Sequence, residues 1–289
     1  MMAVSAAMVK ELRERTGLGM MDCKKALAEV DGDMEKAIED LRKKSSLKAA
    51  KKAGRTTANG LLGIKVADDG SKAALVEINI ETDFAAKNEK FIAFVSKVAD
   101  ELFASADGSL ENLAAALNDE RETLVQEIGE NITIRRGQVM HSASGGLSHY
   151  VHGDQRRGAL VELSANNADL GRDLAMHVVA INPMVINSAD VSADVLDKER
   201  EIYLSQAQDS GKPEEIIIKM VEGRVKKYLA EVSLLDQPFV KDGNVKVSAL
   251  VKQAGVEVQN FLRFEVGEGI EVEELDFAAE VAAQLADSK

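Results

Sequence analysis

Residues 1–55 carry apolar side chains at helical spacing in three successive runs. Thr16-Gly17 ends the first run, Asp22 precedes or caps the second, and Asp31-Gly32-Asp33 is a turn before the third. The pattern predicts a small bundle of three helices. The positions expected to face inward are Ala6, Val9, Leu12, Cys23, Ala26, Leu27, Val30, Met34, Ala37, Ile38 and Leu41.

The basic segment, residues 42–55, is rich in Lys and Arg and poor in large apolar residues. It is interpreted as a linker or as the exposed end of a helix, because a run of like charges is usually solvated and mobile. Contact with RNA is a weaker alternative. The whole chain has a net charge of −13, and tight general binding to nucleic acid requires clustered cations.

Two apolar runs around the turn Asp68-Asp69-Gly70-Ser71 predict a β-hairpin with strands at residues 61–66 and 73–80. A helix is expected from Glu89, with further helical periodicity up to Gly129 and a third strand at residues 132–139. The inner stripe expected for the helix from Glu89 is Phe91, Phe94, Val95, Val98 and Leu102.

Part of this pattern recurs later in the chain. Ala74-Leu75-Val76-Glu77-Ile78 reappears as Ala159-Leu160-Val161-Glu162-Leu163, followed again by a polar turn and a helix that Pro183 ends. The recurrence predicts two related lobes. A further strand is expected at residues 256–266.

Two more helices are expected within residues 192–232, separated by Asp209-Ser210-Gly211-Lys212-Pro213. So short a connection requires them to run antiparallel, as a helical hairpin inserted into the second lobe. A short helix at residues 247–253 and a last helix at residues 277–285 complete the expected elements.

The polar sequence Glu81-Thr82-Asp83 stands between the second predicted strand and the helix from Glu89. Thr82 or Asp83 is suited to cap a helix by accepting a hydrogen bond from a free backbone N–H. Phe84 has two interpretations. Its chemistry alone favours a core position, because most Phe residues are buried, and the alternative is an exposed anchor for another protein.

Length and composition bound the class of protein. A chain of 289 residues exceeds what one core usually holds, so more than one lobe is expected. Cys23 is the single cysteine, which excludes an internal disulfide and suits a reducing compartment. Neither a signal peptide nor an apolar run of membrane-spanning length is evident, so we expect a cytoplasmic protein.

The usual motifs of catalysis are missing from the sequence. It contains no phosphate-binding loop and no dinucleotide fingerprint, and no cofactor is expected. The histidines lack the accompanying Cys or carboxylate pattern of a metal site. Cys23 lies on the apolar side of its helix without a partner signature, which is typical of a core thiol rather than a nucleophile. The histidines are His141, His149, His152 and His177.

Several stretches resemble the signatures of the bacterial elongation factor Ts family. The resemblance spans nearly the whole chain, in order, and its noted departure is Ala85, where the family often has Val. The stretches are Thr82-Asp83-Phe84-Ala85-Ala86-Lys87, Val9-Lys10-Glu11-Leu12-Arg13-Glu14-Arg15-Thr16-Gly17, Met20-Met21-Asp22-Cys23-Lys24-Lys25-Ala26-Leu27 and Phe261-Leu262-Arg263-Phe264-Glu265-Val266-Gly267-Glu268-Gly269.

Together with the periodicity, this resemblance implies an α+β fold. It has an N-terminal three-helix bundle of the ubiquitin-associated type, two related lobes with antiparallel sheets, an inserted helical hairpin or coiled coil, and a C-terminal helix. The expected division is a bundle with basic linker at 1–55, a first lobe at 56–140, a second lobe at 141–189 and 234–265, the hairpin at 190–233 and a C-terminal module at 266–289.

The resemblance also implies a guanine-nucleotide exchange factor for elongation factor Tu, which binds that GTPase in its GDP-bound and nucleotide-free states and has no covalent chemistry of its own. Phe84 would enter between helices of the GTPase near its Mg²⁺ and phosphate site, and Asp83 would support the rearranged contact. The bundle and the final helix would hold the GTPase domain, and the second lobe another domain of the partner.

The residues expected at the partner are Thr82, Asp83, Phe84, Ala85, Ala86 and Lys87 and, in the bundle, Leu12, Arg13, Gly19, Met20 and Met21. Met20 and Met21 have a second interpretation, in which they only close the small core. Two other functions stay open: an adaptor whose bundle binds ubiquitin-like or peptide ligands, and an enzyme that uses Cys23.

Overall fold

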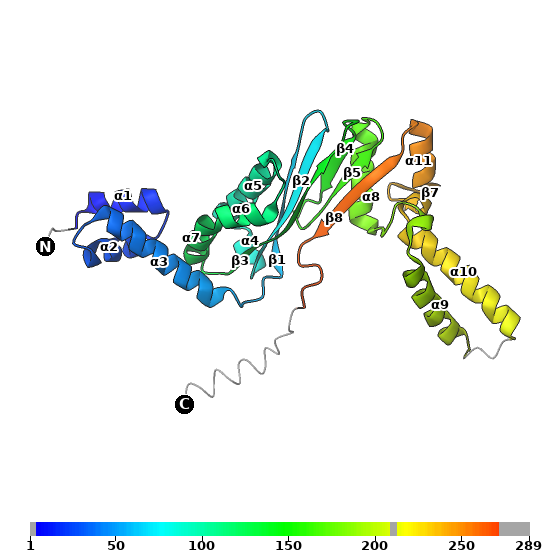
Figure 1. Ribbon diagram of the computed structural model, residues 1–289, viewed down its shortest axis with the longest axis horizontal. Coiled ribbons are helices and arrows are strands. Elements are labelled where there is room, and N and C mark those ends of the chain that lie inside the picture. Colours follow the sequence, from blue (N-terminus) through cyan, green and yellow to red (C-terminus); the bar gives the residue numbers. More distant parts are fainter. Residues whose placement is uncertain (1–3, 209–212, 272–289) are drawn as a thin grey trace.

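The computed structural model describes residues 4–208 and 213–271. Figure 1 shows an elongated arrangement, with a helical bundle at one end, sheet-containing lobes in the middle and a helical hairpin at the other end. The expected α+β class with antiparallel sheets is confirmed. The helix predicted at residues 277–285 lies outside the described residues, and the division into five segments stays a prediction.

The bundle consists of α1 (Ala6–Thr16), α2 (Met20–Glu29) and α3 (Met34–Lys52). The side chains of Ser5 and Asp33 cap α1 and α3 by accepting hydrogen bonds from backbone N–H groups. Gly17 ends α1 with φ 72°, a left-handed turn that suits a residue without Cβ. Gly19 is the N-cap of α2, so Asp22 lies in the first turn and the prediction that it precedes or caps the helix is wrong.

The basic segment is helical, because α3 continues through it to Lys52. The second half of α3 packs on α7 (Asn118–Ile128). There, Ala49 joins the core of the first lobe and the Ser45 hydroxyl donates to the Gln126 side chain. Arg42 pairs with Asp119 across the same contact. Of the two interpretations, the mobile linker is therefore wrong. The segment is the end of a helix, but one side of it is buried against α7. Small buried residues, rather than large apolar ones, hold this half of the helix in place.

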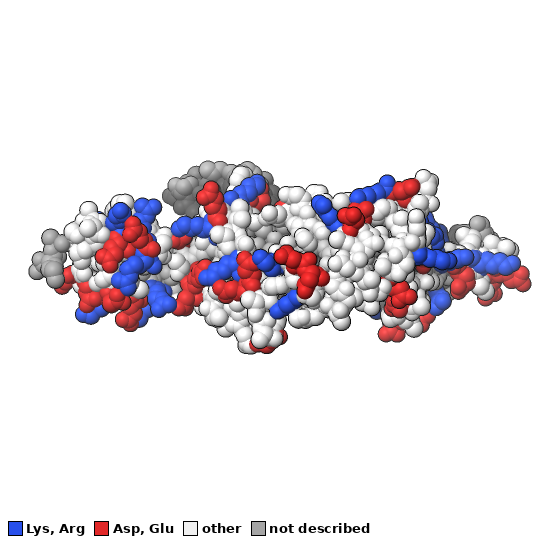
Figure 2. Space-filling model, turned by 90° about the horizontal axis from the view of Figure 1, so that it is seen from above, with Lys and Arg blue, Asp and Glu red and all other residues white. Residues whose placement is uncertain are grey.

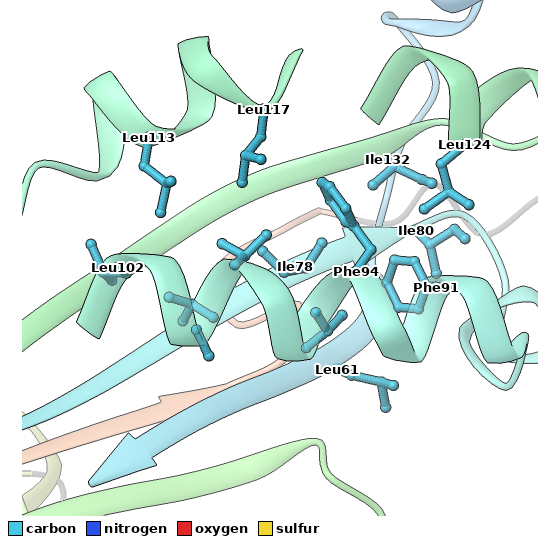
Figure 3. Packing of buried hydrophobic residues seen from close by; sticks show 14 of the residues in the cluster. Leu61, Ile78, Ile80, Phe91, Phe94, Leu102, Leu113, Leu117, Leu124 and Ile132 are labelled. Atoms are coloured by element: carbon cyan, nitrogen blue, oxygen red, sulfur yellow. The ribbon is translucent and has the colours of Figure 1, made fainter. Parts of the chain in front are cut away.

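The first lobe has an antiparallel sheet in the order β1 (Asn59–Val66), β2 (Lys72–Ile80), β3 (Ile132–His141). The helices α5 (Glu89–Ala104), α6 (Leu110–Ala116) and α7 cover one face, and the short α4 (Asp83–Ala86) connects β2 to α5. Figure 3 shows side chains of α5, β2 and the α6–α7 region gathered in one core. The predicted hairpin, helix and third strand are confirmed.

The second lobe repeats this plan with β4 (Leu147–Val151), β5 (Arg157–Leu163) and β8 (Val258–Glu265), in the order β4-β5-β8. The two copies of the recurring sequence are therefore the central strands, β2 and β5, of two sheets. Helices α8 (Ala168–Ile181) and α11 (Val247–Ala254) contribute to this lobe's core. A small separate pair of strands, β6 (Pro238–Phe239) and β7 (Asp242–Lys246), precedes α11.

The two sheets share an inter-sheet layer, with α5 and α8 on their outer sides. Successive residues of a strand point to opposite faces, so the even positions of β2 pack under α5 and the odd positions point into the inter-sheet layer. Glu77 and Asn79 make one end of this layer polar. Its apolar end contains Leu62, Ala73, Leu75, Met140, Leu147, Leu160, Phe264 and Val266.

The arm consists of α9 (Ala193–Gln208) and α10 (Glu214–Val232), which pack on each other as an antiparallel hairpin, as predicted (Figure 1). Short 3₁₀ turns, η1 (Ser188–Asp190) and η2 (Leu234–Asp236), flank it. Val185 forms an isolated bridge with Ser233, and the Leu234 N–H donates to the Val185 carbonyl at 2.9 Å. Both ends of the arm therefore leave the second lobe at one point.

Candidate partner-binding site

The corner after β2 is held by two residues that lie far apart in sequence. Thr82 is the N-cap of α4, and its hydroxyl oxygen accepts a hydrogen bond from Ala85 N–H at 3.2 Å. The same hydroxyl donates to Glu130 at 2.7 Å, and the Thr82 backbone N–H donates to the other oxygen of that carboxylate at 2.9 Å. The capping role expected of Thr82 is confirmed. The clamp by Glu130 was not predicted, because no local pattern indicates a partner 48 positions away.

Phe84 is 81% exposed, so the interpretation of it as a core residue is wrong. Asp83, the first residue of α4, and Lys87, its C-cap, form an ion pair at 3.0 Å. The Lys87 ammonium is 5.4 Å from the centre of the Phe84 ring. The hydrogen bond from Lys87 lowers the pKa of Asp83 below its ordinary value, so this carboxyl is ionised at neutral pH. The corner thus presents an exposed aromatic ring beside a Lys–Asp ion pair.

The other two residues of the signature face the protein. Ala85 is half-buried and packs against the core of the first lobe, and Ala86 is only 5% exposed. Most of the Ala86 side chain therefore anchors α4, and the part that stays exposed lines the groove beside the corner. Its contact with a partner stays a prediction.

A groove of about 540 Å³ lies next to the corner. Lys87, Leu61 and Ile92 line it from the first lobe, and the turn at residues 153–156 lines it from the second. The two lobes are joined at this point, since the Arg156 guanidinium donates to the Asn59 side-chain oxygen at 2.8 Å. The surface around Phe84 therefore includes parts of both lobes.

The bundle presents a second apolar surface at the start of α2. Met20 is 56% exposed and Met21 is 75% exposed, so they do not close the bundle core. Arg13 and Gly19 are also exposed, whereas Leu12 is 0% exposed and supports the bundle from inside. The prediction that Leu12 contacts a partner is therefore wrong for this conformation.

Lys90 connects this part of the bundle to the first lobe. Its ammonium donates to the Gly17 carbonyl at 3.3 Å and pairs with Glu127 at 2.6 Å. Lys90 lies in the first turn of α5, shortly after the signature, so the loop before α2 is attached close to the corner. No local pattern in the sequence indicates this contact.

The described residues contain no group of His, Cys, Asp and Glu side chains that could hold a metal ion. Cys23 is buried, with its sulfur near the Leu18 carbonyl. His177 is also buried: Val240 N–H donates to its Nδ1, so Nε2 carries the proton and donates to Gln237. Burial lowers the pKa of His177, although the hydrogen bond with Gln237 acts in the opposite sense. The contacts of Cys23 and His177 are therefore those of buried side chains that support the fold.

Several cations of the basic segment, residues 42–55, are paired with carboxylates of the protein itself. Lys43 pairs with Glu39, Lys44 with Glu29 and Arg55 with Glu81. Figure 2 shows Lys and Arg interspersed with Asp and Glu over one face of the molecule rather than gathered by sign. This distribution does not resemble the clustered cations of a nucleic-acid surface.

Comparison with known proteins places these features in a family. The model of the family described as "Elongation factor TS" matches residues 81–268. The chain is 57% identical over 286 residues to an elongation factor Ts from Hahella chejuensis, covering 99% of each chain. It is 56% identical over 292 residues to one from Saccharophagus degradans, covering 100% of each. A third, from Teredinibacter turnerae, is 54% identical over 294 residues and covers 100% of this chain and 99% of the relative.

Proposed function

Because the chain belongs to the elongation factor Ts family, we propose that the exposed corner at residues 82–87 promotes the release of GDP from elongation factor Tu. Membership of the family makes the protein a translation elongation factor. Exchange takes place on the partner, so the chain itself needs no nucleotide, no cofactor and no covalent chemistry.

The observation that carries this proposal is the 81% exposure of Phe84 on a corner clamped by Thr82 and Glu130. A large apolar side chain gains free energy when a partner removes it from water. A corner that is already held in one conformation loses little freedom on binding, which favours affinity. Phe84 is therefore suited to enter between helices of the GTPase, with Asp83 supporting the rearranged contact.

Exchange follows from the reciprocity of binding free energies. If the protein binds nucleotide-free elongation factor Tu more tightly than the GDP-bound form, it weakens the affinity for GDP by the same factor. Insertion of Phe84 near the Mg²⁺ and phosphate site of the partner would supply this difference, because the contact forms only once those elements have moved.

The remaining surfaces hold the partner during this step. Met20 and Met21, with Arg13 and Gly19 beside them, would bind the GTPase domain, and the second lobe would bind another domain. We place the protein in the cytoplasm, where translation occurs. Among the described residues, no helix combines the length and the apolar character needed to cross a membrane.

The test is the release of labelled GDP from purified elongation factor Tu, with Phe84→Ala compared to the unchanged protein. Burial of a Phe side chain contributes roughly 2 kcal/mol, so exchange should fall about thirtyfold. The melting temperature should stay the same, because Phe84 contributes little to the fold. Asp83→Ala should have a smaller effect, since one polar contact contributes about 1 kcal/mol net.

Leu47→Ala is the matched control, because Leu47 is also exposed but lies on α3, outside the signature. It should leave exchange unchanged. Equal exchange by the unchanged protein and Phe84→Ala would contradict the proposed role of the corner.

A further inference from the structure

Glu77 is a fully buried carboxylate in the centre of β2. Arg135 donates to one of its oxygens at 2.9 Å and Arg136 donates to the other. The first oxygen also accepts hydrogen bonds from the Gly267 backbone N–H at 2.8 Å and from the Asn79 side chain at 3.1 Å. A buried charge is costly without partners, and this one is fully supplied with donors.

A β-bulge explains how two consecutive arginines reach the same carboxylate. The register of β2 and β3 shifts at this point: Glu77 faces Arg136, Ile78 faces Ile134, and Arg135 is the additional residue between them. In a regular strand, neighbouring side chains point to opposite faces, whereas a bulge places two residues opposite one. The irregularity of β3 therefore serves the contact with Glu77.

The same arginines bind the second lobe. Arg136 donates to the Glu265 carbonyl at 2.9 Å, pairs with Glu268 at 3.1 Å and stacks on Phe264 with its guanidinium carbon 4.4 Å from the ring centre. In Figure 1 the orange β8 ends beside the strands of the first lobe. We name this group of Glu77, Arg135, Arg136, Gly267 and Glu268 the Glu77 clasp. It joins β2, which leads to the corner, to the end of β8 and to the residues that directly follow that strand.

The clasp adds directional contacts between the lobes to those of Leu62 N–H with the Gln155 carbonyl and of Arg156 with Asn59. Apolar contacts such as those of Leu75 with the opposite sheet are non-directional, so they keep the sheets together without fixing their relative position. The contacts that cross between the lobes here are directional: Gly267 N–H donates to Glu77, and Arg136 donates to the Glu265 carbonyl and to Glu268. Each of them loses strength when the sheets shift. Buried ion pairs are weak evidence for stability, and specification of one arrangement is among their attested roles.

We propose that Glu77 is a positioning residue for nucleotide exchange: the clasp keeps the second lobe fixed relative to Phe84. This inference rests on the proposed function, in which the lobes hold different parts of the partner. If the lobes could turn against each other, the binding free energy of the second lobe would be lost in that rotation. With the lobes fixed, the free energy with which the second lobe binds the partner acts on the partner's helices next to Phe84.

The experiment measures GDP release from elongation factor Tu at increasing concentrations of Glu77→Gln, at a temperature well below its melting point. The maximal release rate should fall at least about fivefold, the lower end of usual coupling between sites. The half-saturating concentration should change less than the rate does, because the binding surfaces themselves are intact. Arg136→Met breaks the same contact at the arginine, whose side chain is more exposed than that of Glu77. If Glu77→Gln does not fold, Arg136→Met should give the same pattern.

Glu120→Gln is the matched control, because it removes an ion pair with Lys97 between α5 and α7, away from the inter-sheet layer. It should leave both parameters unchanged. A folded clasp variant with an unchanged maximal rate, or with weakened binding alone, would overturn the proposal. Phe84→Ala in the same assay separates the two ideas: if it too has no effect, the proposed function fails, and if it alone slows exchange, only the role of the clasp fails.

Discussion

Phe84 and Ala86 lie close together on α4, yet the first is exposed and the second is buried. On so short a helix, the turn that buries one side chain directs its neighbour outward. The residue types alone predicted the reverse for Phe84. The family signature identified the right stretch but not the orientation of each side chain, which depends on the clamp by Glu130.

Cys23 gives a prediction that separates binding from covalent chemistry. Cys23→Ala should leave GDP release nearly unchanged, because the thiol is buried in the bundle core and has no role at the proposed partner surface. Removal of the buried sulfur should cost roughly 1 kcal/mol of stability. Exchange and thermal unfolding are measured on the same sample. A folded variant without activity would favour a nucleophilic role for the thiol.

At the level of elements, periodicity predicted most helices and strands, because each buries a stripe or face that is visible in the sequence. Periodicity did not predict the second half of α3. Its buried positions, Ser45 and Ala49, are small, and the surrounding Lys and Arg residues dominate the composition. A helix that packs closely through small residues has no large apolar stripe, so hydrophobic spacing did not reveal it.

Ala49→Glu tests whether α3 and α7 form one unit. A carboxylate at this buried position has no partner, so we expect a loss of about 2–3 kcal/mol in stability. Amide hydrogen exchange should become faster throughout residues 42–52. Lys48→Glu is the control, because it changes the neighbouring exposed residue. Equal protection of this segment in Ala49→Glu and the unchanged protein would contradict the docking.

At the level of the whole molecule, the repeated strand sequence predicted two related lobes but not how they pack. The nearly continuous apolar character of β2 is typical of a strand buried on both faces. Nothing in the sequence pairs Leu75 with the layer that contains Leu160, or Glu77 with a backbone N–H at Gly267. These contacts join positions far apart in the chain and have no local signature.

The Glu77 clasp predicts a pH dependence of stability. Burial alone would raise the pKa of Glu77, but the hydrogen bonds from Gly267, Arg135 and Arg136 outweigh it and hold the pKa below its ordinary value. The unfolded pKa is near ~4.3, so the contribution of the clasp is fully present above that pH and is lost as the pH falls through the lower folded pKa.

Urea unfolding of the unchanged protein and of Glu77→Gln between pH 7 and ~3 checks this sign. At neutral pH the variant should be less stable by about 3 kcal/mol, because the arginines lose a buried counter-charge. The difference should shrink in the acid range. The other carboxyl groups titrate in both proteins, so their contribution cancels in the difference in unfolding free energy. A gap that stays constant down to the acid limit would contradict the assignment.

The common origin of both ends of the arm has a consequence for how such proteins change over generations. Because Val185 and Ser233 are paired where the arm leaves the second lobe, we expect a change in the length of α9 and α10 to leave the sheets in place. The entropy cost of closing a loop grows only slowly with its length. Whole helical turns can therefore be gained, lost or exchanged in a lineage while the sheets that carry the corner keep their geometry, so the arm can diversify independently of nucleotide exchange.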